Sequence, residues 1–168
     1  MKKSIGFKLG AAATVVLTLL TACSTSSKSS SGASAKTTWS RMEGDIISTM
    51  DPSMITDAIS GQAATDTMDG LYRYDGSDLQ PAVAKSVAKP TNNGTVYTYN
   101  LRNSKWSNGD DVTASDFVFA WRRTVDPATK SQYAYLYSGV KNADKIMAGK
   151  AKASTLGVKA LSKDKLQV

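Results

Sequence analysis

The sequence predicts a mixed α/β protein, and three adjacent features between residues 95 and 126 indicate this class. Tyr97, Tyr99 and Leu101 alternate with polar residues, and a period of two is typical of a strand with one buried face. Residues 107–110 read Ser-Asn-Gly-Asp, which favours a tight turn because Asn and Gly tolerate positive φ angles. A helix with a capped start follows. Since these local signals agree with one another, we expect a strand, a turn and a helix in one continuous unit.

The helix of this unit is expected to begin after Thr113, a good N-cap residue. Asp116 lies three positions later and completes a short-armed capping box. The last turn carries two arginines, which the helix dipole favours there, and Asp126-Pro127 ends the helix. Apolar residues recur at every fourth position and predict a stripe that packs on the core: Phe117, Trp121 and Val125. We also expect Trp106 in the core, since this context does not favour a sugar- or base-stacking platform.

Shorter elements are expected on both sides of this unit. Residues 131–137 carry a tyrosine at positions 133, 135 and 137, a spacing that fits an alternating strand. Residues 165–168 resemble the start of a strand that pairs with residues 156–161. The remaining expectations are strands at 45–50 and 71–74, a turn at 75–78, and helices at 62–68 and 142–148.

Composition excludes several classes of function. The chain has 168 residues, enough for one domain with a real core, and it contains no histidine and a single cysteine. Histidine-based acid–base chemistry, Ser-His-Asp triads, ordinary zinc sites and a disulfide framework are therefore excluded, and we expect no metal and no cofactor. Without the three lysines of the leader, 18 basic residues face 14 acidic ones. Because these charges are interspersed, we expect a solvated surface at the lysine-rich end (141–165) and no nucleic-acid partner.

The first 38 residues predict export and attachment to a membrane. Residues 1–8 are a basic n-region, and an apolar stretch from 9 to 20 is too short to span a bilayer comfortably. Leu20-Thr21-Ala22-Cys23 resembles the bacterial lipobox, in which the cysteine becomes the lipidated N-terminus. The chain is thus divided into a lipoprotein signal peptide (1–22), a flexible Ser/Thr-rich tether (23–38) and a folded portion (39–168).

Several blocks of the folded portion, in order and at matching spacing, resemble the oligopeptide-binding proteins of ABC importers, the peptide/nickel substrate-binding family. The most specific is Lys105-Trp106-Ser107-Asn108-Gly109 followed by residues 112–118 and 121–123. The others are Met50-Asp51-Pro52 and residues 69–73, 81–84 and 97–102. Any single block is weak, but together they cover almost the whole chain from about residue 43.

The resemblance implies the N-terminal part of a type II periplasmic-binding-protein-like fold, with two lobes that close over a ligand and an extra small domain. Family members run for several hundred residues more, so we expect this sequence to be the N-terminal fragment. Most of the cleft, including the acidic residue that holds a peptide's α-amino group in the family, would lie beyond Val168. The implied partners are oligopeptides, an ABC permease and, through the lipid anchor, the outer face of a Gram-positive cell membrane.

The resemblance also implies four ligand-binding residues. Thr56, Asp57 and Ala58 match the family segment that runs beside the peptide backbone, where main-chain pairing explains sequence-tolerant binding. Tyr133 matches a tyrosine that closes part of the cleft. From the residues alone, Tyr133 is a core or surface aromatic in an alternating strand, and Asp57 is a solvated loop carboxylate.

Two other classes of function remain as alternatives. A surface hydrolase would use carboxylate pairs such as Asp110-Asp111 or Asp75 with Asp78, although each pair lies in a turn where Asp is expected for turn chemistry alone. A surface interaction lipoprotein, or a non-functional remnant of a split gene, needs no ligand cleft. We expect no catalytic residues.

Overall fold

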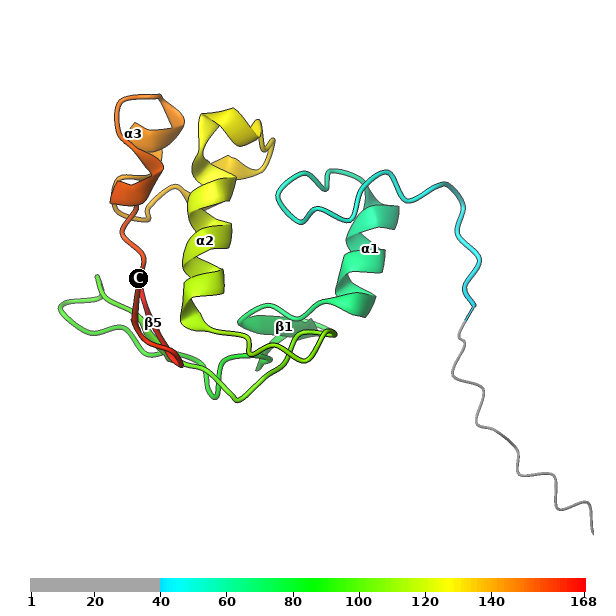
Figure 1. Cartoon of the computed structure of the whole chain (residues 1–168), viewed down its shortest axis with the longest axis horizontal. Coiled ribbons are helices and arrows are strands. Elements are labelled where there is room, and N and C mark those ends of the chain that lie inside the picture. The colour runs from blue at the N-terminus through cyan, green and yellow to red at the C-terminus, as the bar shows by residue number, and fades with distance from the viewer. Residues whose placement is uncertain (1–39) are drawn as a thin grey trace, which may run out of the picture. The chain divides into compact units, whose positions relative to one another are not determined.

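The structure is a computed structural model that describes residues 40–168. The predicted signal peptide, tether and Cys23 lie outside the described residues. Residues Met42–Val168 form one unit by their internal contacts, and the description below concerns this unit. Its helices and strands are distributed along the whole unit (Figure 1), as the predicted mixed class requires.

The elements follow one another without an internal repeat. The α-helices are α1 (Ala58–Thr67), α2 (Ala114–Val125) and α3 (Ala143–Met147). The strands are β1 (Tyr72–Asp75), β2 (Asp78–Pro81), β3 (Thr98–Asn100), β4 (Lys159–Ser162) and β5 (Lys165–Gln167). Three short 3-10 helices connect them: η1 (Pro127–Thr129), η2 (Ala134–Tyr137) and η3 (Ala153–Thr155).

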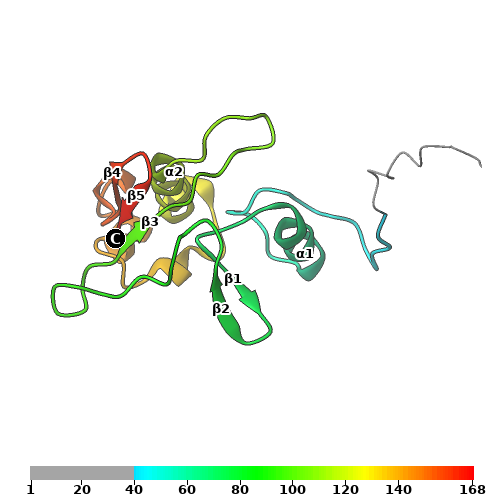
Figure 2. The same cartoon turned by 90° about the horizontal axis from the view of Figure 1, so that it is seen from below.

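The strands form two separate sheets (Figure 2). One is the antiparallel hairpin β1–β2, which turns at Gly76 with φ +61°. The other has the order β3-β5-β4, so the last strand of the chain is the central one and pairs antiparallel with both neighbours. Strand β5 therefore pairs with β4, its hairpin partner, and with β3, which lies about 65 residues earlier in the chain. The sequence did not predict the pairing with β3.

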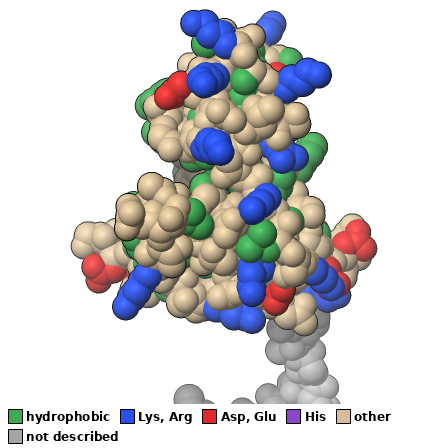
Figure 3. Space-filling view, turned by 90° about the vertical axis from the view of Figure 1, so that its left-hand side faces the viewer, with side chains coloured by type: hydrophobic (Ala, Val, Ile, Leu, Met, Phe, Trp, Pro, Cys, Tyr) green, Lys and Arg blue, Asp and Glu red, His purple; other side chains and the backbone are tan. Residues whose placement is uncertain are grey.

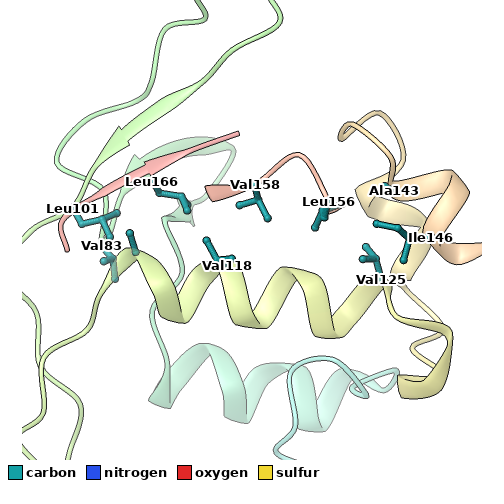
Figure 4. Packing of buried hydrophobic residues seen from close by; sticks show 10 residues of the cluster. Val83, Leu101, Val118, Val125, Ala143, Ile146, Leu156, Val158 and Leu166 are labelled. Carbon is teal, nitrogen blue, oxygen red and sulfur yellow. The ribbon is translucent and has the colours of Figure 1, made fainter. Parts of the chain in front are cut away.

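Helix α2 confirms the predicted capping and packing. The Asp116 carboxylate accepts hydrogen bonds from the Thr113 N–H at 2.7 Å and the Thr113 hydroxyl at 3.0 Å. Helix α2 lies against β5 and β4 with Val118 facing Leu166 and Val158, and Val125 at its other end contacts the region of α3 (Figure 4). Phe117 and Trp121 pack against the same cluster and are half-buried, and the Trp121 and Tyr137 rings meet edge to face at 5.4 Å.

One close approach of two backbones requires a glycine. The N–H of Gly157 donates to the Lys141 carbonyl at 2.8 Å. A Cβ at residue 157 would lie 2.5 Å from the Lys141 Cβ, closer than real Cβ atoms come to a neighbour. Gly157 therefore permits the segment before β4 to lie against the start of α3.

Several sequence expectations were wrong, each for a tertiary reason. Residues 46–50 form no strand, because the N–H groups of Ser48 and Thr49 donate to the Ser60 hydroxyl instead of to a neighbouring strand. Trp106 is 51% exposed and lies outside the core. Residues 134–137 form a 3-10 helix rather than part of an alternating strand.

Other elements were found with shifted bounds. Helix α1 begins four residues before the predicted start of 62, because Asp57 caps it. Thr67 and Met68, which would lie on the packing side of the predicted helix, are exposed. The predicted turn at 75–78 is confirmed as the turn of the β1–β2 hairpin, in which Asp75 pairs with Asp78, and β2 was not anticipated.

The lysine-rich end agrees with the expected solvated surface. On the face shown in Figure 3, Lys and Arg side chains are separated by other residues and form no single patch. All lysines of this end are exposed: Lys141, Lys145, Lys150, Lys152, Lys159, Lys163 and Lys165.

The central position of β5 gives a stability prediction. Leu166 is fully buried, so Leu166→Ala is expected to lower the free energy of unfolding by about 2–5 kcal/mol through lost burial and the cavity left behind. Leu161, in the same hairpin, is 46% exposed, and Leu161→Ala is expected to change stability by less than about 0.5 kcal/mol. Urea unfolding followed by circular dichroism measures both. Equal effects of the two substitutions would contradict the buried position of β5.

Candidate functional site

The segment that carries two of the four expected ligand residues, Thr56 and Asp57, runs from Ser48 to Asp57, and a third, Ala58, begins α1 directly after it. Its first half is fixed by Ser60, whose hydroxyl is fully buried and accepts from the N–H groups of Ser48 at 3.0 Å and Thr49 at 3.3 Å. Ser60 is one of two buried polar side chains in the part of the chain that the structure describes. Its buried oxygen is satisfied by the segment, so the segment and α1 hold each other in place.

Asp57 is occupied by the protein itself. Its Oδ1 accepts from the Ser60 N–H at 2.7 Å, which makes it the N-cap of α1, and its Oδ2 accepts from the Ser48 hydroxyl at 2.5 Å. The hydrogen bonds from Ser48 and Ser60 lower the pKa of Asp57 from 3.8 to about 2. The carboxylate therefore anchors the segment. The Asp57 carbonyl accepts from the Gly61 N–H at 3.1 Å, so the part of Asp57 that remains for a ligand is its N–H.

The second fixed point of the segment is the C-terminal turn of α2. Arg123 binds Asp51 with two hydrogen bonds, Nη1 to Oδ1 at 2.8 Å and Nη2 to Oδ2 at 2.5 Å. This fork lowers the pKa of Asp51. Beside it, the hydroxyls of Ser53 and Thr124 share a hydrogen bond of 2.9 Å. Thr124 is the other buried polar side chain of residues 40–168.

Thr56 has free main-chain groups on an exposed part of this segment. Thr56 and Ala58 are exposed, whereas Ile55 and Asp57 are half-buried, so exposure alternates along the segment. Within the described residues, no partner is found for the N–H or the carbonyl of Thr56. Asp57, directly after it, has extended backbone at φ −109° and ψ 155°. A ligand in extended conformation can therefore pair with a main-chain donor and acceptor here.

Tyr133 lies in the segment that follows α2. It precedes η2, its side chain is 43% exposed, and its ring is 6.0 Å from that of Tyr135. No direct contact joins Tyr133 to residues 56–58 in the described part of the chain. Both segments are nevertheless linked to the C-terminal end of α2. Residues 48–57 are linked through the Asp51–Arg123 contact, and the Tyr133 segment follows α2 directly in the chain. Figure 1 shows the loop before α1 directed toward this end of α2.

A wide pocket lies elsewhere in the described residues. It has a volume of about 730 Å³ and contains none of the four expected ligand residues. Its walls come from the outer side of α2 together with η3 and β4: Ser115, Val118, Phe119, Arg122, Arg123, Asp126, Thr129, Ala153, Lys159 and Ala160. We place the candidate site at residues 54–58 because free main-chain groups on a fixed segment define a binding surface, which an open hollow does not.

Of the carboxylate pairs considered for catalysis, Asp110-Asp111 has structural partners. Lys105 and Lys163 both form ion pairs with Asp111 and lower its pKa to about 2. Asp110 accepts from the side chain of Asn108. Between residues 40 and 168 there is no cluster of three or more potential metal-ligating side chains, and no helix with the length and hydropathy to cross a bilayer. The ion pair between Asp111 and Lys163 links the loop before α2 to the β4–β5 turn.

Sequence reasoning missed the residues that hold the segment: Ser48, Asp51, Ser53, Ser60, Arg123 and Thr124. Two of them lay in blocks that the sequence had singled out, Asp51 in Met50-Asp51-Pro52 and Arg123 in Trp121-Arg122-Arg123. Arg123 was assigned only to the helix dipole. A pairing between two blocks 72 residues apart has no local signal.

A fixed loop with free main-chain groups, carried on a helix-and-sheet unit, can bind a ligand through its backbone. Comparison with known proteins agrees with a class of binding proteins. Residues 78–168 match the model for the middle region of the bacterial extracellular solute-binding proteins, family 5. The chain belongs to this family, as the resemblance of its sequence blocks indicated.

Relatives in this family include peptide-binding proteins. The chain is 43% identical over 118 residues to the dipeptide-binding protein of Lactococcus lactis, covering 69% of this chain and 21% of that protein. It is 40% identical over 138 residues to the periplasmic oligopeptide-binding protein OppA of Salmonella typhimurium, covering 79% and 25%. The chain thus spans a fifth to a quarter of the length of these relatives.

Solved structures confirm the fold class. Listeria monocytogenes OppA bound to peptide has a TM-score of 0.72 and 41% identity, with 75% of this chain and 25% of that chain covered. The substrate-binding domain of an oligopeptide ABC transporter from Bacillus anthracis has a TM-score of 0.72 and 44% identity, with 76% and 25% covered. The mixed helix-and-strand unit is therefore periplasmic-binding-protein-like, as expected.

The cap at Asp57 gives a pH prediction. Because its folded pKa of about 2 lies below the ordinary 3.8, the carboxylate stabilises the start of α1 fully above pH 3.8 and loses this effect as the pH falls toward 2. NMR chemical shifts of residues 58–62 between pH 5 and 2 should show α1 fraying at its N-terminus.

Two substitutions serve as controls. Asp57→Asn keeps a good N-cap but cannot titrate, so the start of α1 should persist at low pH. Asp57→Ala should fray at every pH. If wild-type α1 is unchanged down to pH 2, the role of Asp57 as a charged cap is wrong.

Proposed function

We propose that this chain contributes a peptide-contacting segment to an extracytoplasmic oligopeptide-binding lipoprotein, which captures peptides and delivers them to an ABC permease. The observation that carries the proposal is the unpaired N–H and carbonyl of Thr56 on an exposed segment that is fixed at both ends. The names of the relatives support it, since they include dipeptide- and oligopeptide-binding proteins. One related structure, OppA of Haemophilus influenzae, is a complex with the peptide RPPGFSPFR.

Main-chain pairing at Thr56 explains why such a site would accept many peptides. Every peptide offers the same N–H and C=O groups, so pairing with them carries no side-chain preference. Ala58 is small and exposed, which leaves room for a ligand beside the segment. Asp57 contributes by holding this backbone, and Tyr133 offers an exposed ring for apolar contact with the ligand.

The proposed activity is binding without chemical change. Among the carboxylates considered for catalysis, Asp111 has the clearest structural partners, because two lysines form ion pairs with it and keep it ionised. Its pKa of about 2 makes it a poor general base near neutral pH. We therefore assign no catalytic residue and no cofactor.

A surface interaction lipoprotein is a second candidate, favoured by exposed apolar side chains on α2 and η2. Phe119 and Leu136 are each 69% exposed. Such side chains suit contact with another protein, a role that needs no peptide. The peptide titration below separates the two candidates.

The peptide proposal predicts localised NMR shifts. Because the chain spans a quarter or less of its relatives, we choose a method that detects millimolar affinities. A pool of tripeptides to pentapeptides, added to the isotopically labelled chain, should shift the amide signals of Thr56 and Ala58 and the ring signals of Tyr133. A mixture of free amino acids of the same composition should leave them in place, since it cannot pair as an extended main chain.

A variant at position 56 sharpens this test. Thr56→Pro removes the N–H and should abolish the shifts at Ala58, whereas Thr56→Ser keeps the main chain and should preserve them. If the wild-type chain shows no shift with the pool, peptide contact at this segment is refuted and the interaction role is favoured.

The proposed anchor predicts lipid labelling at one residue. We propose that Cys23 carries acyl chains that hold the protein to the outer face of a Gram-positive cell membrane. In cells given radiolabelled palmitate, the wild-type chain should take up label and fractionate with membranes, whereas Cys23→Ala should lose both. Labelling of the Cys23→Ala chain would place the anchor elsewhere.

A further inference from the structure

Polar contacts supply the fixed points of residues 48–57, because apolar burial contributes little there. The apolar side chains that precede Ile55 are exposed: Ile46 (79%), Ile47 (48%), Met50 (38%) and Met54 (38%). Both buried polar side chains of residues 40–168, Ser60 and Thr124, are hydrogen-bonded to this segment. The location of the segment therefore depends on a few hydrogen bonds and one ion pair.

The two fixed points have different supports. Ser60 belongs to α1, which buries only that one residue. Arg123 belongs to α2, which buries Ala114, Val118, Thr124 and Val125 and contacts β4, β5 and α3. Since α2 is the better anchored helix, the contact with Arg123 determines where the segment lies relative to the core.

The Asp51–Arg123 contact has the geometry of a positioning contact. A guanidinium that binds both carboxylate oxygens fixes direction as well as distance, which a single hydrogen bond does not. Asp51 Oδ1 also accepts from the Ser53 N–H at 3.0 Å, so the carboxylate links the turn at 51–54 to α2. The side chains are 38% exposed for Arg123 and 30% for Asp51, so solvent weakens the pair without removing it.

We propose that Asp51 and Arg123 are positioning residues for the ligand-facing residues 54–58, because their two-bond ion pair fixes this stretch against the end of α2 from which the Tyr133 segment continues. The inference rests on the proposed function for its consequence for the ligand. The positioning itself is independent of any ligand.

Hydrogen exchange measured by mass spectrometry on the full chain tests the positioning. Asp51→Asn keeps an oxygen for the Ser53 N–H but loses the negative charge. Arg123→Gln removes the guanidinium and with it the two hydrogen bonds to Asp51. Each should speed amide exchange in residues 48–58 about two- to fivefold, the range that a partly exposed ion pair supports, and leave α2 and β5 unchanged. Arg123→Lys, which keeps the charge without the fork, should give a smaller effect than Arg123→Gln.

A double substitution shows whether the two residues act as one contact. Asp51→Asn combined with Arg123→Gln should exchange no faster than either single variant, because the first change already removes the interaction. The control is Asp111→Asn, which removes two ion pairs, with Lys105 and Lys163, near the other end of α2 and should leave residues 48–58 unchanged. Unchanged exchange in the single variants, or faster exchange throughout the unit, would overturn the positioning role.

The peptide titration adds a separate readout. In the Asp51→Asn variant, a higher concentration of the peptide pool should be needed to shift the amide signal of Thr56. The ring signals of Tyr133 should no longer shift over the same concentration range. If wild type shows no peptide shift but the exchange results hold, the proposed function fails and the positioning stands. If peptides shift Thr56 equally in wild type and Asp51→Asn, the ion pair has no role in the ligand site and the inference is wrong.

Discussion

The contact between α2 and the central strand β5 supports the rest of the described unit. Leu166 of β5 is fully buried, and β5 pairs with β3 on one side and β4 on the other. The turn between β4 and β5 also receives the start of α2, since the Ala114 N–H donates to the Lys163 carbonyl at 2.8 Å. Hydrophobic burial and hydrogen bonding thus fix α2 at its apolar face and its N-terminus. Everything attached to its C-terminal turn takes its position from this arrangement.

The candidate site uses that fixed helix end. Arg123 and Thr124 hold Asp51 and Ser53, and α1 holds the other end of the same segment through Ser60. Thr56 then presents an unpaired N–H and carbonyl on an exposed part of this segment. Ordering a loop costs conformational entropy, and here polar contacts within the protein offset this cost before a ligand arrives. A preorganised main-chain surface is what a binding protein needs in order to accept peptides of varied sequence.

Elements with strong local signals were predicted well. The capping box, the Asn-Gly turn and the apolar stripe of α2 each depend on residues within four positions of one another, and all three are present. The family also followed from short blocks at fixed spacing. At the site, the position of Thr56 came from the resemblance alone. Neither the local sequence pattern nor the resemblance predicted the partners of Asp57. The sequence around a loop carboxylate does not indicate whether it faces solvent, a ligand or its own helix.

The sequence by itself determined the class of the fold, the family and the local form of α2, because these are properties of neighbouring residues and their spacing. Only the tertiary structure decided that β5 is a central strand, that residues 46–50 form no strand, and that Asp51 is paired with Arg123. Each of these depends on groups that are 12 to 72 residues apart. Periodicity and capping describe how a chain folds on itself locally. They do not predict which distant group will accept a given hydrogen bond. Such long-range hydrogen bonds, which join Ser60 and Arg123 to residues 48–57, determine where the candidate site lies.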